Sequence, residues 1–243
     1  MSTTNHNLCS LAFSIRNLWL EGKVPYCIVC ANDREAKLFY QNLLMLLPSE
    51  DVTYLPTWET LPYDNLSTTQ TISSKRLAIL HQLTQNRTFI LVTSLSNCIK
   101  PTMTKEVLMQ HALQCHTKQN LSLQSFSKQL ATFNYLSVSK VQSPGEFAKR
   151  GSLLDVFPSG TPHAFRLDFF DDTLDSIRII DPETQKSQRS LTEINLLPKH
   201  ECLLASEQIT HFRSCWRTLF GNEQQKHPIY QQVSKGHPFP GME

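Results

Sequence analysis

The hydrophobic pattern of this 243-residue chain changes near residue 113. Before that point, helices with one apolar face alternate with short unbroken apolar runs at 26–31 and 88–93. Such runs are typical of parallel strands that helices cover on both faces. After that point, runs of alternating apolar and polar residues are typical of antiparallel strands with one face on a core. We therefore expect two kinds of α/β structure in one chain.

The first region is predicted to contain three helices around its parallel strands. Apolar residues recur at helical spacing over 11–22, and Gly22 is a plausible C-cap. Asn32 or Asp33 can cap a helix over 34–47, which Pro48 ends. A third helix is expected over 71–85.

The second region is predicted to be a smaller α+β domain. A helical pattern over 121–135 precedes predicted strands at 136–141, 151–157, 164–170 and 174–180. Asp171-Asp172-Thr173 is a short polar turn between the last two strands, which predicts a hairpin. An amphipathic helix is expected over 206–220, with an apolar stripe, and the tail from 222 on is polar and rich in proline. The stripe contains Ile209, Phe212, Cys215, Trp216 and Leu219.

The glycine content excludes three common enzyme signatures. The chain has only seven glycines, and no pair five residues apart is followed by Lys, as a phosphate-binding loop requires. No two glycines lie two or four residues apart, so the dinucleotide fingerprint and the nucleophile elbow are also absent. The sequence therefore predicts no catalytic residue and no cofactor.

Charge and cysteine usage indicate a cytoplasmic protein that does not bind membranes. The formal net charge is +2, and no segment carries the basic field that bulk phosphate binding needs. No apolar run approaches the length of a membrane span or an export signal. The seven cysteines are expected to be reduced thiols.

Several short patterns have a structural explanation that we favour over a chemical one. Cys27 and Cys30 match C-x-x-C, but they lie within an apolar strand, where no helix N-terminus lowers a thiol pKa. No metal site is expected, because the few neighbouring His and Cys residues do not complete a ligand set. These candidates are His111, Cys115 and His116. His200 begins a segment that resembles H-E-x-x-H but fails at its final position, Leu204. The carboxylates near the hairpin are expected to be solvated turn residues: Asp168, Asp171, Asp172 and Asp175.

The predicted strand 164–170 carries the most informative surface. Alternation places Phe165, Leu167 and Phe169 on one face, and Arg166, Asp168 and Phe170 on the other. An aromatic residue beside an Arg on an accessible strand surface has the composition of a protein-binding hot spot. Alternatively, Phe170 folds over the end of the hairpin. Lys149-Arg150 stand just before Gly151, which is predicted to start a strand, and could approach the same surface.

Five segments together resemble the bacterial transcription-repair coupling factors, the Mfd family. They occur in the family's order and span nearly all of this chain, but only the N-terminal UvrB-like module of a much longer protein. The segments are LPTWETLPYD at 55–64, GEFAKRGSLLDVFP at 145–158, RLDFFDD at 166–172, DPETQKS at 181–187 and IYQQVSKG at 229–236.

The resemblance implies a degenerate P-loop-like (RecA- or Rossmann-like) parallel-sheet domain with an inserted α+β domain that binds UvrA. Residues 1–112 would form the first domain, 113–199 the UvrA-interaction domain, and 200–243 a segment returning to pack on the first. The family's UvrA-contacting positions are Arg150, Arg166 and Phe170 here. The module would be a non-catalytic adaptor that recruits nucleotide excision repair to stalled RNA polymerase.

The resemblance also implies partners that lie outside this chain. The C-terminal domain of the full-length protein would mask the UvrA surface, and RNA polymerase, DNA, ATP and Mg would be bound only by further domains. The family usually has Ser-Pro where Ser67-Thr68 stands and Arg where Lys186 stands. The chain begins near the helix that should follow the first strand and stops before an expected apolar segment, so a piece of a longer protein is expected.

A hypothesis from another class is a helicase-like domain that binds nucleotide or DNA directly. It predicts measurable affinity for ATP, or salt-dependent affinity for DNA. The glycine positions and the even charge balance both disfavour it.

Overall fold

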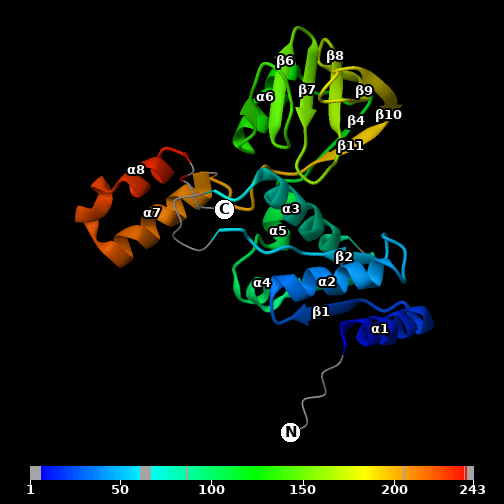
Figure 1. Cartoon of the computed structure of the whole chain (residues 1–243). Helices are drawn as coiled ribbons and strands as arrows, with labels where there is room; N and C mark the ends of the chain where they lie inside the picture. Colours follow the sequence, from blue (N-terminus) through cyan, green and yellow to red (C-terminus); the bar gives the residue numbers. More distant parts are fainter. Residues whose placement is uncertain (1–6, 61–66, 86, 205, 238, 240–243) are drawn as a thin grey trace. The chain divides into compact units, whose positions relative to one another are not determined.

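The computed structural model of the chain describes residues 7–60, 67–85, 87–204, 206–237 and 239, so part of the motif at 55–64 lies outside the described residues. The chain divides into two compact units (Figure 1). The first unit takes residues up to 58 and 79–105, and the second takes 59–78 and 106 onward. The predicted mixed α/β class is confirmed, whereas the likeness to a P-loop domain and the limits of the three domains stay predictions.

The first unit contains a three-stranded parallel sheet with the order β1-β3-β2. Its elements are α1 (Leu8–Gly22), β1 (Tyr26–Cys30), α2 (Asp33–Leu44), β2 (Val52–Tyr54), the end of α3 (Gln70–Thr84), β3 (Ile90–Ser94) and α4 (Leu95–Ile99). The three predicted helices and the two predicted strands are present with bounds shifted by a few residues, whereas β2 and α4 were not predicted.

Coverage of this sheet differs between its strands. All five residues of the central strand β3 are buried, as predicted for a strand covered on both faces. Val29 on β1, however, is 47% exposed, and Cys27 is exposed on the same face. The prediction of a buried strand at 26–31 is therefore wrong for one face, the face that carries Cys27 and Val29.

The ends of the first two helices test the predicted caps. The Asn32 side chain accepts a hydrogen bond of 2.9 Å from the Glu35 amide, which confirms the cap of α2. Gly22 is the last residue of α1, and the left-handed C-cap is Lys23, with φ of 45°. The predicted glycine cap is therefore wrong by one residue, because the helix includes Gly22 before the backbone reverses at Lys23.

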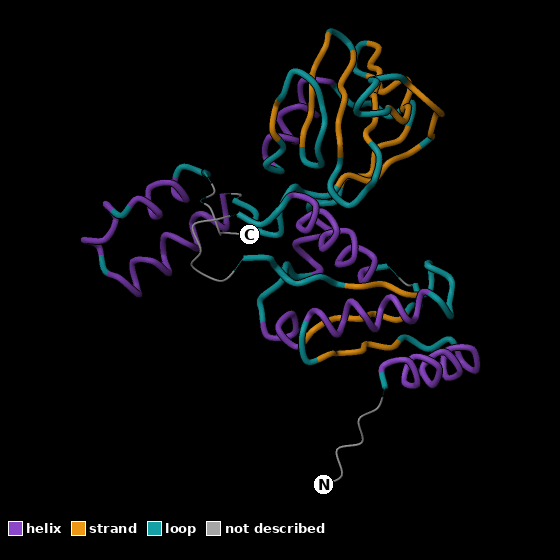
Figure 2. The backbone as a smooth tube through the Cα atoms, in the orientation of Figure 1, coloured by secondary structure: helices purple, strands orange, loops and turns teal. Residues whose placement is uncertain are grey.

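The second unit is built around a six-stranded sheet with the order β10-β9-β8-β7-β6-β5 and a separate pair, β11-β4 (Figure 2). Its elements are α5 (Lys105–Gln110), β4 (Leu113–His116), α6 (Leu123–Thr132), β5 (Leu136–Ser137), β6 (Glu146–Arg150), β7 (Leu153–Phe157), β8 (Ala164–Phe170), β9 (Thr173–Ile180), β10 (Ser187–Leu191), β11 (Glu193–Leu196), α7 (Ser206–Phe220), a 3-10 helix η1 (Asn222–Lys226) and α8 (Pro228–Ser234).

Several predicted boundaries in the second unit need correction. Gly151 does not start a strand: it lies in the turn between β6 and β7 with φ of 60°, a conformation that glycine adopts without steric cost. The predicted strand at 136–141 shortens to the two residues of β5. The tail also forms η1 and α8, because Pro228 at the first turn and the His227 side chain start a helix there.

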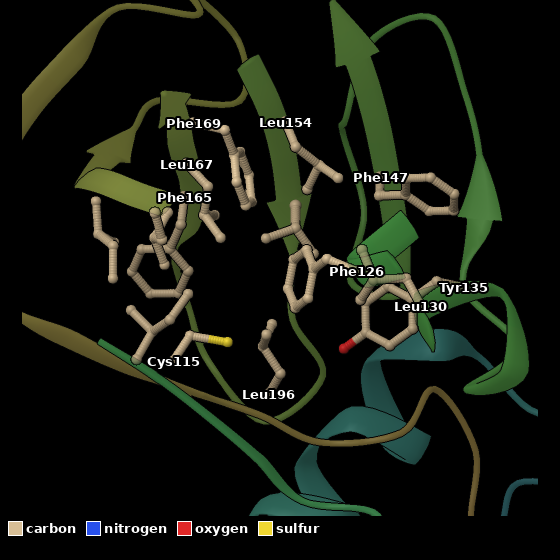
Figure 3. Packing of buried hydrophobic residues seen from close by; sticks show 14 of the residues in the cluster. Cys115, Phe126, Leu130, Tyr135, Phe147, Leu154, Phe165, Leu167, Phe169 and Leu196 are labelled. Carbon is tan, nitrogen blue, oxygen red and sulfur yellow. The ribbon is translucent and has the colours of Figure 1, made fainter. Parts of the chain in front are cut away.

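One face of the six-stranded sheet packs on the core of this unit (Figure 3). Phe126 and Leu130 of α6 are fully buried there, and the rings of Phe126 and Phe169 lie 6.2 Å apart between centroids. Cys115 of β4 lies in the same cluster, where burial raises its pKa to about 12. The residues of β8 that point to this core are Phe165, Leu167 and Phe169, every second residue of the strand.

Helix α7 has the predicted apolar stripe without a fully buried residue. Rings of Phe212, Trp216 and Tyr230 pack against one another with centroids 5.5–6.0 Å apart, while Leu219 is exposed. Within the described residues, no helix combines the length and apolar content needed to cross a membrane.

Candidate partner-binding face

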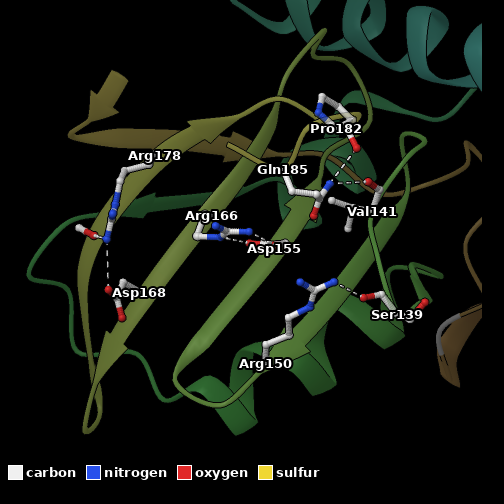
Figure 4. Close-up of polar contacts among 10 residues, drawn as sticks. Ser139, Val141, Arg150, Asp155, Arg166, Asp168, Arg178, Pro182 and Gln185 are labelled. Atoms are coloured by element: carbon white, nitrogen blue, oxygen red, sulfur yellow. Dashed lines mark hydrogen bonds and ion pairs between the residues drawn. The ribbon is translucent and has the colours of Figure 1, made fainter. Parts of the chain in front are cut away.

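The six-stranded sheet has a second face, opposite the core, that carries the predicted site residues Arg150 and Arg166 (Figure 4). The third predicted residue, Phe170, ends β8 on the same side. Phe165, Leu167 and Phe169 are buried in the core, so the alternation predicted for 164–170 is confirmed. We call the charged part of the opposite side the outer face. It comprises Arg150, Asp155, Arg166, Asp168, Phe170 and Arg178.

Strand register forms a charged row across this face. Asp155 on β7 lies opposite Arg166 on β8, which in turn lies opposite Arg178 on β9. Two positively charged side chains directly opposite each other would repel. Each of the two guanidinium groups has its own carboxylate, which offsets that repulsion.

Arg166 forms a two-point ion pair with Asp155. Its Nε donates to Asp155 Oδ1 at 2.7 Å, and its Nη2 donates to Oδ2 at 2.8 Å. The side chain of Asp155 is 2% exposed and that of Arg166 is 18% exposed. The hydrogen bonds to Asp155 raise the pKa of Arg166 further. Arg166 is therefore held inside the fold at one end of its guanidinium, and is not a free surface cation.

The neighbouring pair on this face is looser. Nη2 of Arg178 donates to Asp168 Oδ2 at 3.2 Å and to the Ser176 hydroxyl at 3.3 Å. Both charged side chains are about one-third exposed, at 38% for Arg178 and 33% for Asp168. An exposed pair of this kind is held weakly and can exchange partners.

Arg150 lies on the same side of the sheet as Arg166. It is the last residue of β6 and is exposed, and its Nη2 donates to the Ser139 carbonyl oxygen at 2.6 Å. Lys149 lies opposite the core residue Leu154, so strand alternation directs it to the other face. Of the basic pair noted in the sequence, only Arg150 belongs to the outer face.

Phe170 is the most exposed large apolar residue of the sheet. It is the last residue of β8, opposite Thr173, and is 74% exposed. This exposure disfavours the alternative prediction, in which Phe170 folds over the end of the hairpin. An aromatic ring left in water beside charged side chains is available to a partner.

The rest of this side of the sheet is covered by the chain itself. Ala148, Phe157, Ala164 and Ile180 form a small core with Val141, which comes from the loop after β5. The Gln185 side chain donates to the carbonyl oxygens of Val141 and Pro182 and ties two covering loops together (Figure 4). Because the chain covers this side of the sheet at one end, the accessible residues of the outer face are mainly Arg150, Asp168, Phe170 and Arg178.

The other chemical candidates in the sequence do not gather into a site. Cys27 and Cys30 point to opposite sides of β1, and desolvation raises the pKa of both thiols, which disfavours redox chemistry. Among the described residues, no three His, Cys, Asp or Glu side chains come together in a way that could hold a metal ion.

Sequence reasoning missed two members of the outer face, Asp155 and Arg178. Asp155 lies in the apolar run Leu153-Leu154-Asp155-Val156-Phe157, where a lone carboxylate in a strand signals a buried partner. Arg178 has the alternating position expected of an accessible residue, but only strand register shows that it lies opposite Arg166.

Comparison with known proteins places this sheet in a family. A family model described as the UvrB interaction domain matches residues 113–202. Residues 113–202 are thus similar to UvrB interaction domains. The outer face and the core beneath it both lie within the matched residues.

The chain as a whole is similar to transcription-repair-coupling factors. It is 38% identical to the protein of Escherichia coli (strain K12) over 86% of this chain and 18% of that protein. It is 38% identical to the protein of Haemophilus influenzae over 89% of this chain and 19% of that protein, and 31% identical to that of Rickettsia bellii over 95% and 21%. The chain thus spans about a fifth of the curated relatives it matches, and the predicted resemblance to their UvrB-like module is confirmed.

Proposed function

We propose that this chain is a non-catalytic adaptor module that binds UvrA through the outer face of its UvrB interaction domain. The observation that carries the proposal is the exposed ring of Phe170 on a sheet face that also holds three arginines. Phe170 would be the apolar anchor, and Arg150 and Arg166 would donate charge-assisted hydrogen bonds to acidic groups of UvrA.

The setting supports such a contact. Arginine and aromatic residues are enriched at binding hot spots, where most of the binding energy is concentrated in few side chains. The Nε and Nη2 contacts of Arg166 with Asp155 engage two of its five N–H donors, which leaves three for a partner. Arg150 donates one hydrogen bond to a carbonyl oxygen and retains its full charge.

The test is a titration of UvrA with the purified 243-residue chain and two variants, by isothermal calorimetry. Phe170→Ala should weaken UvrA binding about thirtyfold, which corresponds to the threshold of about 2 kcal/mol that defines a binding hot spot. Arg150→Ala should weaken it about tenfold. Matched controls come from the first unit: Phe13→Ala, an exposed phenylalanine, and Arg34→Ala, an exposed arginine, should bind as the parent does. Absence of UvrA binding, or equal binding by all variants, would refute the proposal.

In a full-length transcription-repair coupling factor, we expect this module to bring nucleotide excision repair to stalled RNA polymerase. ATP, Mg and DNA would be bound by other domains of that protein. Titration of the chain with labelled ATP and with duplex DNA separates the adaptor from a helicase-like domain. Tight binding of either would favour the helicase-like alternative.

The same proposal includes masking of the outer face by the C-terminal domain of a full-length relative. This chain should bind UvrA constitutively, and the isolated C-terminal domain should compete with UvrA for it. If saturating C-terminal domain leaves UvrA binding unchanged, the masking part of the proposal is wrong while the adaptor role stands.

A further inference from the structure

The two arginine–aspartate pairs of the outer face differ in a way that bears on binding. Asp155 is almost completely buried and contacts Arg166 through both carboxylate oxygens. Asp168 is one-third exposed and contacts Arg178 through one oxygen. The two-point geometry fixes both the position and the plane of a guanidinium, whereas a single bond fixes neither.

Orientation matters because an arginine side chain is long. Holding such a side chain in one rotamer at an interface costs on the order of 1 kcal/mol of conformational entropy. In this domain Asp155 has already fixed Arg166 before any partner arrives. A partner that hydrogen bonds to the remaining N–H groups of Arg166 therefore finds them in place.

Asp155 itself is inaccessible to a partner. Its side chain is 2% exposed, and it lies in the strand register between Ala148 of β6 and Arg166 of β8. Any effect of Asp155 on binding must therefore pass through another residue. Arg166 is the residue to which it is hydrogen bonded.

From this geometry we infer that Asp155 is a positioning residue for partner binding: it orients the Arg166 guanidinium toward the partner without touching the partner. The inference rests on the proposed function of the outer face. It adds a residue that the exposed surface alone does not reveal.

The test is a double-mutant cycle measured as affinity for UvrA. Arg166→Gln should weaken binding about tenfold, and Asp155→Asn, which keeps the shape but loses the charge and one acceptor, about fivefold. The double variant should be no weaker than Arg166→Gln alone, because Asp155 acts only through Arg166. Losses that multiply to about fiftyfold would overturn the inference.

A second readout reports the orientation directly. In the parent chain, the Arg166 Nε–H should give a single slowly exchanging NMR cross-peak, and Asp155→Asn should broaden it or speed its exchange. The matched control is Asp51→Asn in the first unit, since Asp51 is a mostly buried carboxylate that accepts from Trp19 Nε1 at 3.0 Å. This control should change neither the Arg166 signal nor the affinity.

Two further outcomes are distinguishable. If Phe170→Ala weakens binding but Asp155→Asn does not, the inference is wrong and the adaptor proposal stands; if neither the parent nor any variant binds UvrA, the adaptor proposal itself is wrong. Should Asp155→Asn fail to fold, Asp155→Glu keeps the charge but displaces it by one methylene. Asp155→Glu should weaken binding by a smaller factor, and parent-like affinity of that variant together with a displaced Arg166 signal would overturn the inference.

Discussion

In the three-stranded sheet the central strand β3 is buried at every residue, whereas in the six-stranded sheet β8 alternates between buried and accessible residues. The accessible residues of the two sheets also differ in chemistry. On β1 they are Cys27 and Val29, with no charge between them, while on β8 they include Arg166 and Asp168.

This difference bears on the proposal that the outer face binds a partner. An apolar strip attracts any apolar surface, and it gives a partner no polar group to match. The outer face combines one exposed ring with oriented charges, and in the proposed function the ring would anchor the partner while the charges discriminate between partners.

The largest difference should appear in native thiol labelling. Cys115 is 3% exposed with a pKa of about 12, so it should react only when the second unit opens, whereas Cys27 is accessible in the folded state. We expect Cys27 to be alkylated at least about a thousandfold faster at pH 8, since opening a stable domain costs several kcal/mol. Peptide mapping by mass spectrometry measures both rates, and similar rates would show that the second core is not closed.

The next effect concerns packing. Phe126→Ala should lower the free energy of unfolding of the second unit by about 3–5 kcal/mol, because it empties a fully buried position against Phe169. Val29→Ala on the open side of β1 should cost under about 1 kcal/mol. Urea unfolding, followed by hydrogen exchange in each unit, measures the loss of unfolding free energy in both variants. Equal losses would contradict the contrast between the two sheets.

The two ion pairs of the outer face should differ in stability as well. Arg166→Ala leaves the buried Asp155 carboxylate without its partner, which should cost about 3 kcal/mol. Arg178→Ala removes an exposed pair and should cost under about 1 kcal/mol. Chemical denaturation of the two variants measures this. A similar cost for both would show that Asp155 is well solvated in the folded state.

The expected loss of stability also affects how binding data should be interpreted. Because Arg166→Ala is expected to destabilise the domain, lost UvrA binding by that variant would not by itself identify a contact. Arg166→Gln retains a side chain that can hydrogen bond to Asp155, so it is the more suitable variant for measuring the effect of Arg166 on UvrA binding.

The smallest effect is expected at the turn after β9. The Asp181 carboxylate accepts hydrogen bonds from the amides of Thr184 and Glu183, and these lower its pKa. A lowered pKa in the folded state gives stability that is present above the unfolded pKa of about 3.9 and is lost as the pH falls through the folded value. Asp181→Asn should therefore flatten the loss of stability below pH 4. Unfolding measured at pH 2–5 tests this, and unchanged pH dependence would contradict it.

Much of the local structure could be predicted from the sequence. The hairpin at 171–172, the helix over 206–220 and the inward and outward residues of β8 all follow from periods of two or 3.6 residues. Phe170 and Arg166 could be assigned to the outer side for the same reason. The weakly patterned strand β6 was missed because Phe147 and Ala148 are both buried, on opposite faces.

The pairing of the outer face could not be predicted in this way. The turn at Asp171-Asp172 places Phe170 opposite Thr173, and a regular ladder would then place Arg166 opposite Ile177. A register shift between Asp168 and Phe169 instead places Arg166 opposite Arg178. A one-residue shift of this kind depends on the packing of both strands and leaves no clear mark in the residues themselves.

Several helices and strands, the face to which each side chain of β8 belongs, and the similarity of residues 113–202 to the UvrB interaction domain could be read from the sequence, because these depend on short-range periodicity and on ordered motifs. The fold was needed to show that Arg166 is held by a buried Asp155, that Arg178 joins the same row, and that Phe170 is exposed. The reason is that charge pairing and exposure depend on which strands become neighbours, and strand neighbours are chosen by contacts between residues far apart in the chain.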